Sequence, residues 1–172
     1  MEWISRFIRR KAAFVYPVLP APRTAVLEPW FRAKGSIQVF DRGWRPEVAA
    51  FRPAAIAGTW QHLEPLLGMQ IEPLTHAVIV FARKSDRLLT LEQRRRLWRA
   101  FRVPVFEQII GENGALLAAE CEAHAGLHVA SPVFDVAGRA VETAKCGCGR
   151  SSPRVISAGQ VDEVRATAAY AR

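Results

Sequence analysis

All three cysteines of this 172-residue chain lie in its last third, and two of the four histidines accompany them. The segments ECEAHAGLHV (120–129) and KCGCGR (145–150) together contain Cys121, His124, His128, Cys146 and Cys148. Thiolates and imidazoles are the ligands that zinc prefers in a closed tetrahedral site. Such a site requires the two segments to face each other. The pattern therefore predicts a structural zinc ion and constrains the fold of this part of the chain.

The residues around the second segment favour a tight turn at a metal. Gly147 and Gly149 flank Cys148, and glycine can take the positive-φ conformations that let backbone amides approach a thiolate. A disulfide between Cys146 and Cys148 is sterically awkward across one residue and would leave Cys121 unpaired. Isolated reduced thiols, or a cysteine nucleophile with a histidine partner, would also account for these residues, but paired cysteines flanked by glycines suit a metal better.

The first segment predicts two strands joined by a turn at 122–126. In this hairpin Cys121 and His128 can lie opposite each other on one face, while His124 lies in the turn at a C-x2-H spacing. From the spacing, either histidine could be the fourth ligand beside the three cysteines.

Longer motifs surround both segments: VPVFEQIIGENGALLAAECEAHAGLHV (103–129) and CGCGRSSPRVISAGQVDE (146–163). They resemble the zinc-bearing branch of the phenylacetate–CoA ligase type of adenylate-forming enzymes, over about residues 75–163. The most specific matches are to that family's Glu-Cys strand, Gly-Leu-His turn and Cys-x-Cys-Gly-Arg knuckle. The resemblance implies a structural zinc ion held by Cys121, His128, Cys146 and Cys148, with His124 as the alternative ligand.

The catalytic motifs of that family are degenerate in this chain. Where the ligases have Tyr-Gly-x-Thr-Glu beside the adenylate, this chain has Ile-Ile-Gly-Glu-Asn (109–113), and no phosphate-binding loop precedes it. The family's Gly-Arg-x-Asp hinge is Gly-Gln-Val-Asp (159–162), and the ten residues after it are too few for the lid domain and its lysine. We therefore expect no catalytic residues and predict a non-catalytic accessory or partner-binding module. The alternatives are a subunit of a split adenylate-forming ligase and, with weaker support, a zinc-ribbon-like nucleic-acid binder.

The remaining patterns predict a single small α/β domain. HAVIVFA (76–82) is a continuous apolar run, typical of a strand covered on both faces, and 103–110 is a second strand. Between them Thr90 and Gln93 form a capping box at the start of a helix. This βαβ unit should have parallel strands, and a zinc-stabilised hairpin and knuckle region at 115–160 follows it within a domain spanning 24–172. The helix's expected buried stripe is Leu91, Leu97, Trp98 and Phe101. Further strands are expected at 36–41, 115–121, 127–130 and 133–136, and further helices at 60–67 and 161–170.

Residues 1–23 are interpreted as a basic amphipathic segment followed by a Pro-rich linker. This segment could pack on its own domain, dock on a protein partner or lie on a membrane surface. Because it has no signal-peptide cleavage site and no apolar stretch reaches 18 residues, we expect a cytoplasmic protein without a transmembrane segment.

Several charged residues have no motif around them. The net charge of +8 is compatible with a nucleic-acid partner, but the arginines at 94–96, 99 and 102 are expected mainly on an exposed helix face. We interpret His62 and His76 as ordinary core or surface residues. Glu107 and Glu112 could imitate an acid–base pair, but no nucleophile or base accompanies them.

Overall fold

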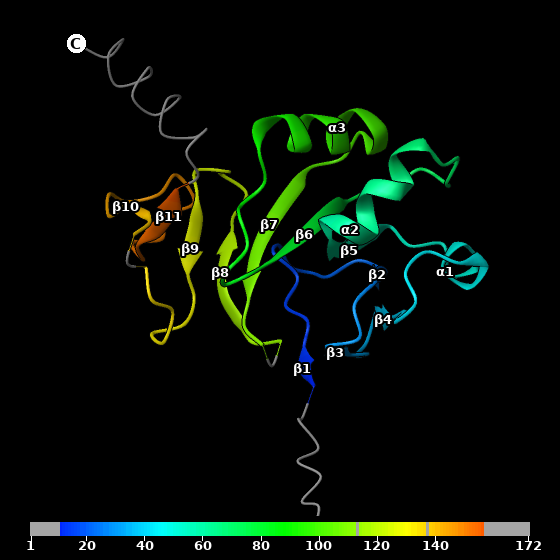
Figure 1. Cartoon of the computed structure of the whole chain (residues 1–172), viewed down its shortest axis with the longest axis horizontal. Coiled ribbons are helices and arrows are strands. Elements are labelled where there is room, and N and C mark those ends of the chain that lie inside the picture. Colours follow the sequence, from blue (N-terminus) through cyan, green and yellow to red (C-terminus); the bar gives the residue numbers. More distant parts are fainter. Residues whose placement is uncertain (1–10, 113, 137, 157–172) are drawn as a thin grey trace, which may run out of the picture.

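The computed structural model describes residues 11–112, 114–136 and 138–156, which form a single small α/β domain (Figure 1). Its centre is a nine-stranded sheet. Its strands, in the order in which they lie side by side, are β10 (Ala140–Glu142), β11 (Arg154–Ile156), β9 (Leu127–Val129), β8 (Leu116–Glu120), β7 (Val105–Ile110), β6 (Ala77–Arg83), β5 (Ala55–Thr59), β2 (Thr24–Val26) and β4 (Ile37–Val39). The other elements are α1 (Pro46–Phe51), α2 (Trp60–Leu63), the 3₁₀-helix η1 (Glu64–Gly68), α3 (Leu91–Phe101), and a small parallel pair of strands, β1 (Ala12–Ala13) and β3 (Phe31–Arg32).

The sheet has a parallel half and an antiparallel half. Strands β4, β2, β5, β6 and β7 are parallel to one another, whereas every pair from β7 through β8, β9 and β11 to β10 is antiparallel. Parallel neighbours need a crossover connection, and α3 supplies it between β6 and β7. The predicted α/β class and βαβ unit are therefore confirmed.

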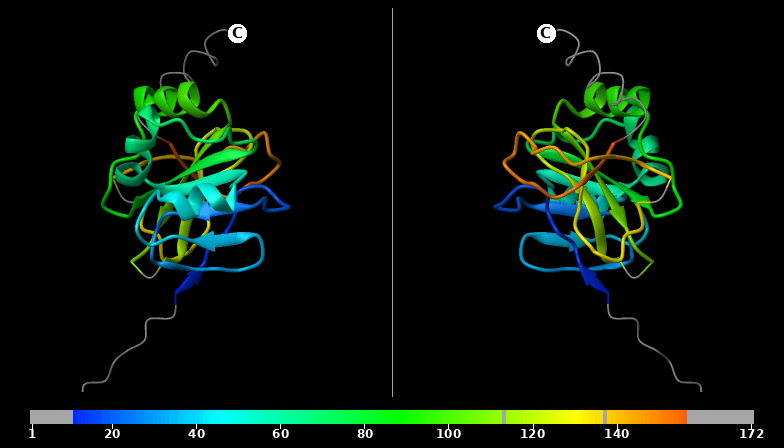
Figure 2. Two further views of the ribbon diagram at one scale, coloured as in Figure 1. Left: turned by 90° about the vertical axis from the view of Figure 1, so that its right-hand side faces the viewer. Right: turned by 90° about the vertical axis from the view of Figure 1, so that its left-hand side faces the viewer.

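The core has one cluster on each face of the parallel strands. Because side chains alternate along a strand, Val78 and Val80 of β6 pack on the side of the helices. Ile79 and Phe81 pack on the opposite side, against a cluster that includes Phe14. Figure 2 shows α3 and β1 on opposite sides of the sheet. The continuous apolar run of β6 reflects this burial on both faces.

The capping box of α3 forms as predicted, since the Thr90 hydroxyl and the Gln93 side chain bond to each other's backbone amides. The predicted buried stripe is only half right. Leu97 and Phe101 are buried, but Leu91 and Trp98 are 48% and 51% exposed. The apolar face of α3 is narrower than expected. The Arg94 side chain takes part of the face toward the sheet, where it donates to the carbonyl of Val105.

Two other expected elements differ from the structure. The helix expected at 60–67 is α2 followed by the 3₁₀-helix η1, and the change of helix type coincides with Pro65. Residues 133–136 form the end of a turn and an irregular loop instead of a strand, and Phe134 of this loop belongs to the same buried cluster as Leu127 and Val155. The helix expected at 161–170 and the amphipathic part of 1–23 lie outside the described residues.

No helix in the described ranges is long and apolar enough to cross a membrane.

Candidate metal centre

Four of the five candidate ligands lie together at the end of the antiparallel half of the sheet. The ligand atoms of Cys121, His128, Cys146 and Cys148 all lie within 4.8 Å of one another. The Sγ atoms of Cys121 and Cys146 are 3.7 Å apart, and Sγ of Cys148 is 3.4 Å from Nε2 of His128. A zinc–sulfur bond of about 2.3 Å in a tetrahedron separates two sulfurs by roughly 3.8 Å. The four residues are therefore close enough to hold a metal ion, and their spacing is consistent with zinc.

Strand pairing brings the ligands together. His128 in β9 is paired with Ala119 of β8 on one side and with Arg154 of β11 on the other. Cys121 follows the last residue of β8, so it does not lie directly opposite His128 as the hairpin pattern suggested. The turn that carries Cys146 and Cys148 comes before β11. Because β11 pairs with β9, this turn lies beside His128 and Cys121.

Two glycines take positive-φ conformations in these segments, one at a close approach of two chain segments and the other in the turn at Cys148. Gly126 has φ +105°, and a Cβ atom there would lie 2.9 Å from the carbonyl oxygen of Val155. Gly149 has φ +88°, and its N–H donates to the carbonyl of Cys146. Gly147 does not have a positive φ, so only one of the two glycines beside Cys148 uses the conformation predicted for both.

His128 is held in the orientation that a metal ligand needs. The residue is 3% exposed, and Nδ1 lies 2.8 Å from the hydroxyl oxygen of Ser152, which leaves Nε2 facing the sulfur of Cys148. Burial, with smaller contributions from Arg150 and Arg154, lowers the pKa of His128. The imidazole is therefore neutral near pH 7, the form in which it binds metals.

The thiols differ in how readily they ionise. Burial raises the pKa of Cys121 to about 12. Burial alone would also raise the pKa of Cys146, but hydrogen bonds from Cys148 and Cys121 and the nearby charge of Arg154 lower it overall. Arg154 is 6% exposed and is held by the carbonyl oxygens of Ala125 and Ala144. This buried cation, which the sequence pattern did not identify, would offset part of the charge of three thiolates.

His124, the alternative ligand, belongs to a different set of contacts. Its Nδ1 lies 3.1 Å from Oε1 of Glu120, and its ring stacks on Phe106 with centroids 4.8 Å apart. It is absent from the group of side chains close enough to share a metal. The geometry therefore favours His128 as the fourth ligand.

The two glutamates that could imitate an acid–base pair do not lie together in one site. Glu107 is buried in β7, where it accepts the N–H of Leu89 and lies 3.7 Å from Arg94. Burial raises the pKa of Glu107 to about 7. Glu112 is exposed in the turn after β7.

The sequence pattern did not predict one polar cluster. Glu28, Thr59 and His62 are hydrogen-bonded to one another at the end of the parallel strands, although His62 has no motif around it. Glu28 and Thr59 stand at the ends of short strands that were themselves not predicted, so no local pattern indicated this cluster.

A comparison with models of known protein families finds no match, and a comparison with curated proteins finds none either. The fold and the site thus define the chain as a small α/β domain with a three-cysteine, one-histidine cluster.

Proposed function

We propose that this chain is a zinc-binding, non-catalytic module whose metal is structural. The observation that carries the proposal is the convergence of Cys121, His128, Cys146 and Cys148 within 4.8 Å of one another. Three cysteines and one histidine are a complete tetrahedral set, whereas catalytic zinc sites keep one position for water or substrate. The first three of these residues are buried, and Cys148 is partly buried.

The small core around the site supports a structural role for the metal. The apolar cluster of the antiparallel half has six buried members, and three of them are Ala118, Leu127 and Val155. A core of this size contributes little stability by itself, and small domains commonly compensate with a metal. One ion would cross-link the residue after β8, strand β9 and the turn before β11. In the cytoplasm, where we expect this protein to be, thiols stay reduced and available to zinc.

The module has an accessory or partner-binding role, and its sequence resembles part of a phenylacetate–CoA ligase-type enzyme. Support comes from the segment that replaces the ligases' Tyr-Gly-x-Thr-Glu motif. Ile109 and Ile110 are at most 1% exposed and belong to the core, so neither presents a side chain to a nucleotide. A subunit of a split adenylate-forming ligase, whose ATP site lies on another chain, is the alternative. A nucleic-acid binder that uses the exposed arginines of α3 has weaker support.

Elemental analysis of protein prepared without a histidine tag tests the metal. We expect about one zinc ion per chain after expression in zinc-replete medium. The variant in which Cys121 and Cys146 are both serine should contain almost none. A wild-type content below roughly 0.2 zinc per chain would contradict the proposal.

Adenylation assays distinguish the module from the split ligase. The isolated chain should not catalyse ATP–pyrophosphate exchange with aryl or acyl acids, because its sequence has no phosphate-binding loop and lacks the ligases' Tyr-Gly-x-Thr-Glu motif. Exchange that appears only when a co-purified protein is added would favour the split ligase. Exchange by the isolated chain that a point mutation abolishes would contradict a non-catalytic role.

A further inference from the structure

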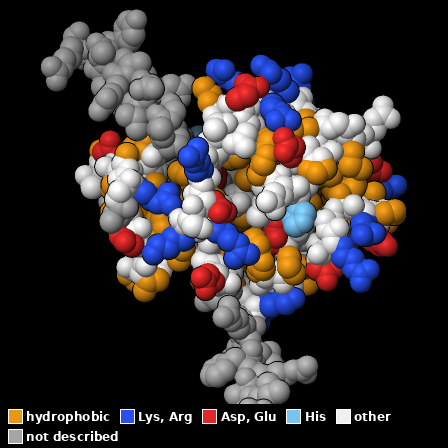
Figure 3. Space-filling model, in the orientation of Figure 1, with side chains coloured by type: hydrophobic (Ala, Val, Ile, Leu, Met, Phe, Trp, Pro, Cys, Tyr) orange, Lys and Arg blue, Asp and Glu red, His pale blue; other side chains and the backbone are white. Residues whose placement is uncertain are grey.

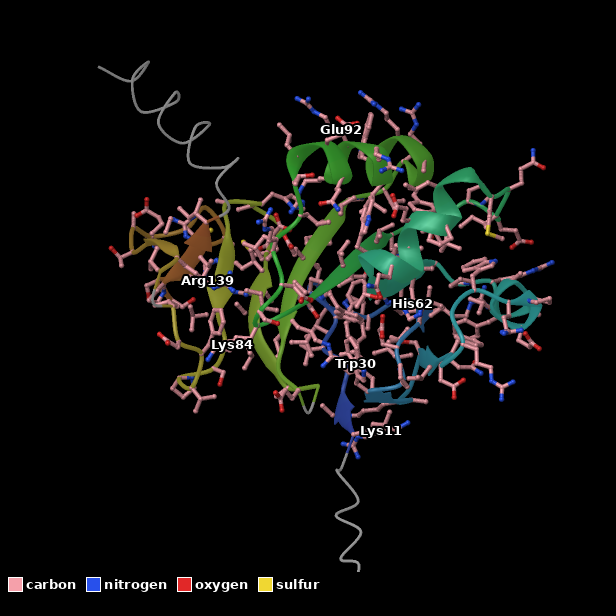
Figure 4. All side chains as sticks on the ribbon, viewed as in Figure 1. Lys11, Trp30, His62, Lys84, Glu92 and Arg139 are labelled. Atoms are coloured by element: carbon pink, nitrogen blue, oxygen red, sulfur yellow. The ribbon has the colours of Figure 1, made fainter. Side chains whose placement is uncertain are left out.

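A cleft lies at the carboxyl ends of the parallel strands, away from the cysteine cluster. It has a volume of about 590 Å³, and its lining includes residues at or just after the ends of three strands: Glu28 after β2, Thr59 of β5 and Arg83 of β6. The carboxyl ends of parallel strands form one edge of a sheet, where open α/β sheets bind their ligands. The volume is within the range of small-molecule sites. Figure 4 labels His62 and Trp30 on this face, and both line the cleft.

A buried carboxylate fixes the orientation of the histidine in this cleft. Glu28 is 2% exposed, and its Oε1 accepts hydrogen bonds from the backbone N–H of Thr59 at 2.9 Å and from the Thr59 hydroxyl at 2.8 Å. The same oxygen lies 2.7 Å from Nδ1 of His62. Because an ionised carboxylate only accepts hydrogen bonds, Nδ1 of His62 carries the proton. In the neutral ring, Nε2 is then the acceptor.

Nε2 of His62 is accessible to a ligand. The side chain is 37% exposed, and no atom of the described ranges is hydrogen-bonded to Nε2. Gly43 lies against this edge of the ring, since a Cβ atom there would be 3.4 Å from Cδ2 and 4.0 Å from Nε2. The absence of a side chain at residue 43 therefore leaves room beside the acceptor nitrogen.

Aromatic rings supply part of the cleft's wall. Trp30 and Trp60 both line it, and the guanidinium of Arg83 lies 4.0 Å from the ring centroid of Trp30. Flat, partly exposed rings of this kind favour an aromatic ligand that can pack against them. The cleft therefore combines an apolar wall with one oriented hydrogen-bond acceptor.

The charges around the cleft do not favour an anion. Acidic and basic side chains both surround the pale blue histidine on this face in Figure 3. The surface charges of the lining balance, namely Asp41 and Asp86 against Arg83 and Arg87, while its other two carboxyl groups, Glu28 and Glu107, are buried. Arg83 is already engaged with Trp30. A neutral ligand is thus favoured over a carboxylate or a phosphate.

We propose that this cleft binds a small neutral aromatic molecule with a hydroxyl group, of the phenol class, whose O–H donates to Nε2 of His62. Glu28 is a positioning residue, because it keeps the proton of His62 on Nδ1. Trp30 and Trp60 pack against the aromatic ring of the ligand. This site contains none of the candidate metal ligands, so the proposal can be tested independently of the proposed zinc module.

Ligand-observed NMR on the full, metal-loaded chain tests this site with three probes: 4-methylphenol, toluene and benzoate. We expect saturable binding of 4-methylphenol, roughly threefold to tenfold tighter than toluene, because toluene lacks the hydroxyl. Benzoate should bind more weakly than 4-methylphenol. In a ¹H–¹⁵N spectrum, 4-methylphenol should shift the amide signals of Thr59 and Arg83.

Variants test the roles of the two polar residues. His62→Ala should abolish the preference for 4-methylphenol over toluene, whereas His76→Ala, at the opposite end of β6, should retain it. Glu28→Gln should reduce the preference as well, because the amide can donate to Nδ1 and so move the ring proton to Nε2.

Three results with the wild-type chain would overturn the proposal. They are equal affinity for 4-methylphenol and toluene, benzoate binding as tightly as 4-methylphenol, or no saturable binding of 4-methylphenol up to its solubility. Each comes from the wild-type chain, so the test does not depend on the variants folding. Retention of the preference in a folded His62→Ala chain would also overturn it.

Discussion

The guanidinium of Arg94 in α3 lies 3.0 Å from the carboxylate of Glu120, the residue immediately before the candidate metal ligand Cys121. The same guanidinium donates to the carbonyl of Val105 and lies 3.7 Å from the buried carboxylate of Glu107. Arg94 thereby connects the helix on the parallel half of the sheet to β8, the strand that leads to the first candidate ligand.

Replacing Arg94 should destabilise the fold much more than replacing its neighbour. Arg94→Met leaves the buried carboxylate of Glu120 without its cation, and because Arg94 is 24% exposed we expect a loss of about 2 kcal/mol in the free energy of unfolding. Arg95→Met, on the exposed side of α3, should change it by less than about 0.5 kcal/mol. Urea unfolding of both variants measures the difference, and equal losses would contradict a bridging role for Arg94.

The two histidines near the cysteines should differ in their effect on metal binding. His128→Ala removes a ligand and should lower the apparent zinc affinity by more than about 100-fold, beyond the effect of losing an outer-shell partner. His124→Ala should leave the affinity nearly unchanged, because His124 contacts Glu120 and Phe106 instead. Competition with a chromophoric chelator gives both affinities. The opposite order would reassign the fourth ligand.

The hydroxyl of Ser152 should contribute to zinc affinity through His128. Ser152→Ala removes the partner of Nδ1, and we expect about a tenfold weaker affinity. Ser151→Ala, at the exposed neighbouring position, is the matched control. The same chelator competition measures both, and no difference between them would show that Ser152 does not orient the ligand.

Removing the metal should loosen one half of the sheet selectively. Hydrogen exchange should accelerate in β8, β9 and β11, which carry or adjoin the ligands, while β5 and β6 stay protected by their two apolar clusters. Mass spectrometry before and after chelation measures this, with the double serine variant of Cys121 and Cys146 as a metal-free reference. Uniform loss of protection would indicate that the metal supports the whole fold.

Glu107 should make the folded chain less stable as the pH rises. Its pKa is raised from 4.5 to about 7 by burial, so between these values the folded state binds more protons than the unfolded state. This contribution to stability is fully present below pH 4.5 and is lost as the pH rises through 7. The whole effect is on the order of 3 kcal/mol.

A comparison with Glu107→Gln isolates this effect. The amide does not titrate, so the stability of wild type relative to Glu107→Gln should fall between about pH 5 and pH 8. Glu112→Gln, at an exposed position, should show no such trend relative to wild type. Denaturant unfolding of metal-loaded protein across this pH range measures both differences, and a flat difference for Glu107→Gln would show that its carboxyl group ionises normally in the fold.

Local patterns predicted the elements that carry their own signal. The apolar run of β6 and the capping box of α3 are each contained within a dozen residues, and both form as expected. The cysteine spacing likewise pointed to the four side chains that the fold brings together. In contrast, β2 and β10 have three residues each and depend on pairing with distant strands, which no local pattern encodes.

Long-range polar contacts explain what the sequence did not predict. Glu28 and His62 are 34 residues apart, and they meet only because β2 and β5 are neighbours in the sheet. Arg94 looked like part of a solvated arginine cluster, and its inward position depends on Glu120, 26 residues later. Such pairs are fixed by tertiary structure, not by the residues around them.

The short distance between Cys121 and Cys146 has a consequence for handling the protein in air. Their sulfur atoms are 3.7 Å apart, so a chain without a metal has two thiols in van der Waals contact. Dissolved oxygen can then oxidise the pair to a disulfide, which removes two of the four ligands. Metal loss under aerobic conditions would become irreversible until a reductant is added. Zinc would thus act as the protecting group of these thiols as well as the cross-link between strands.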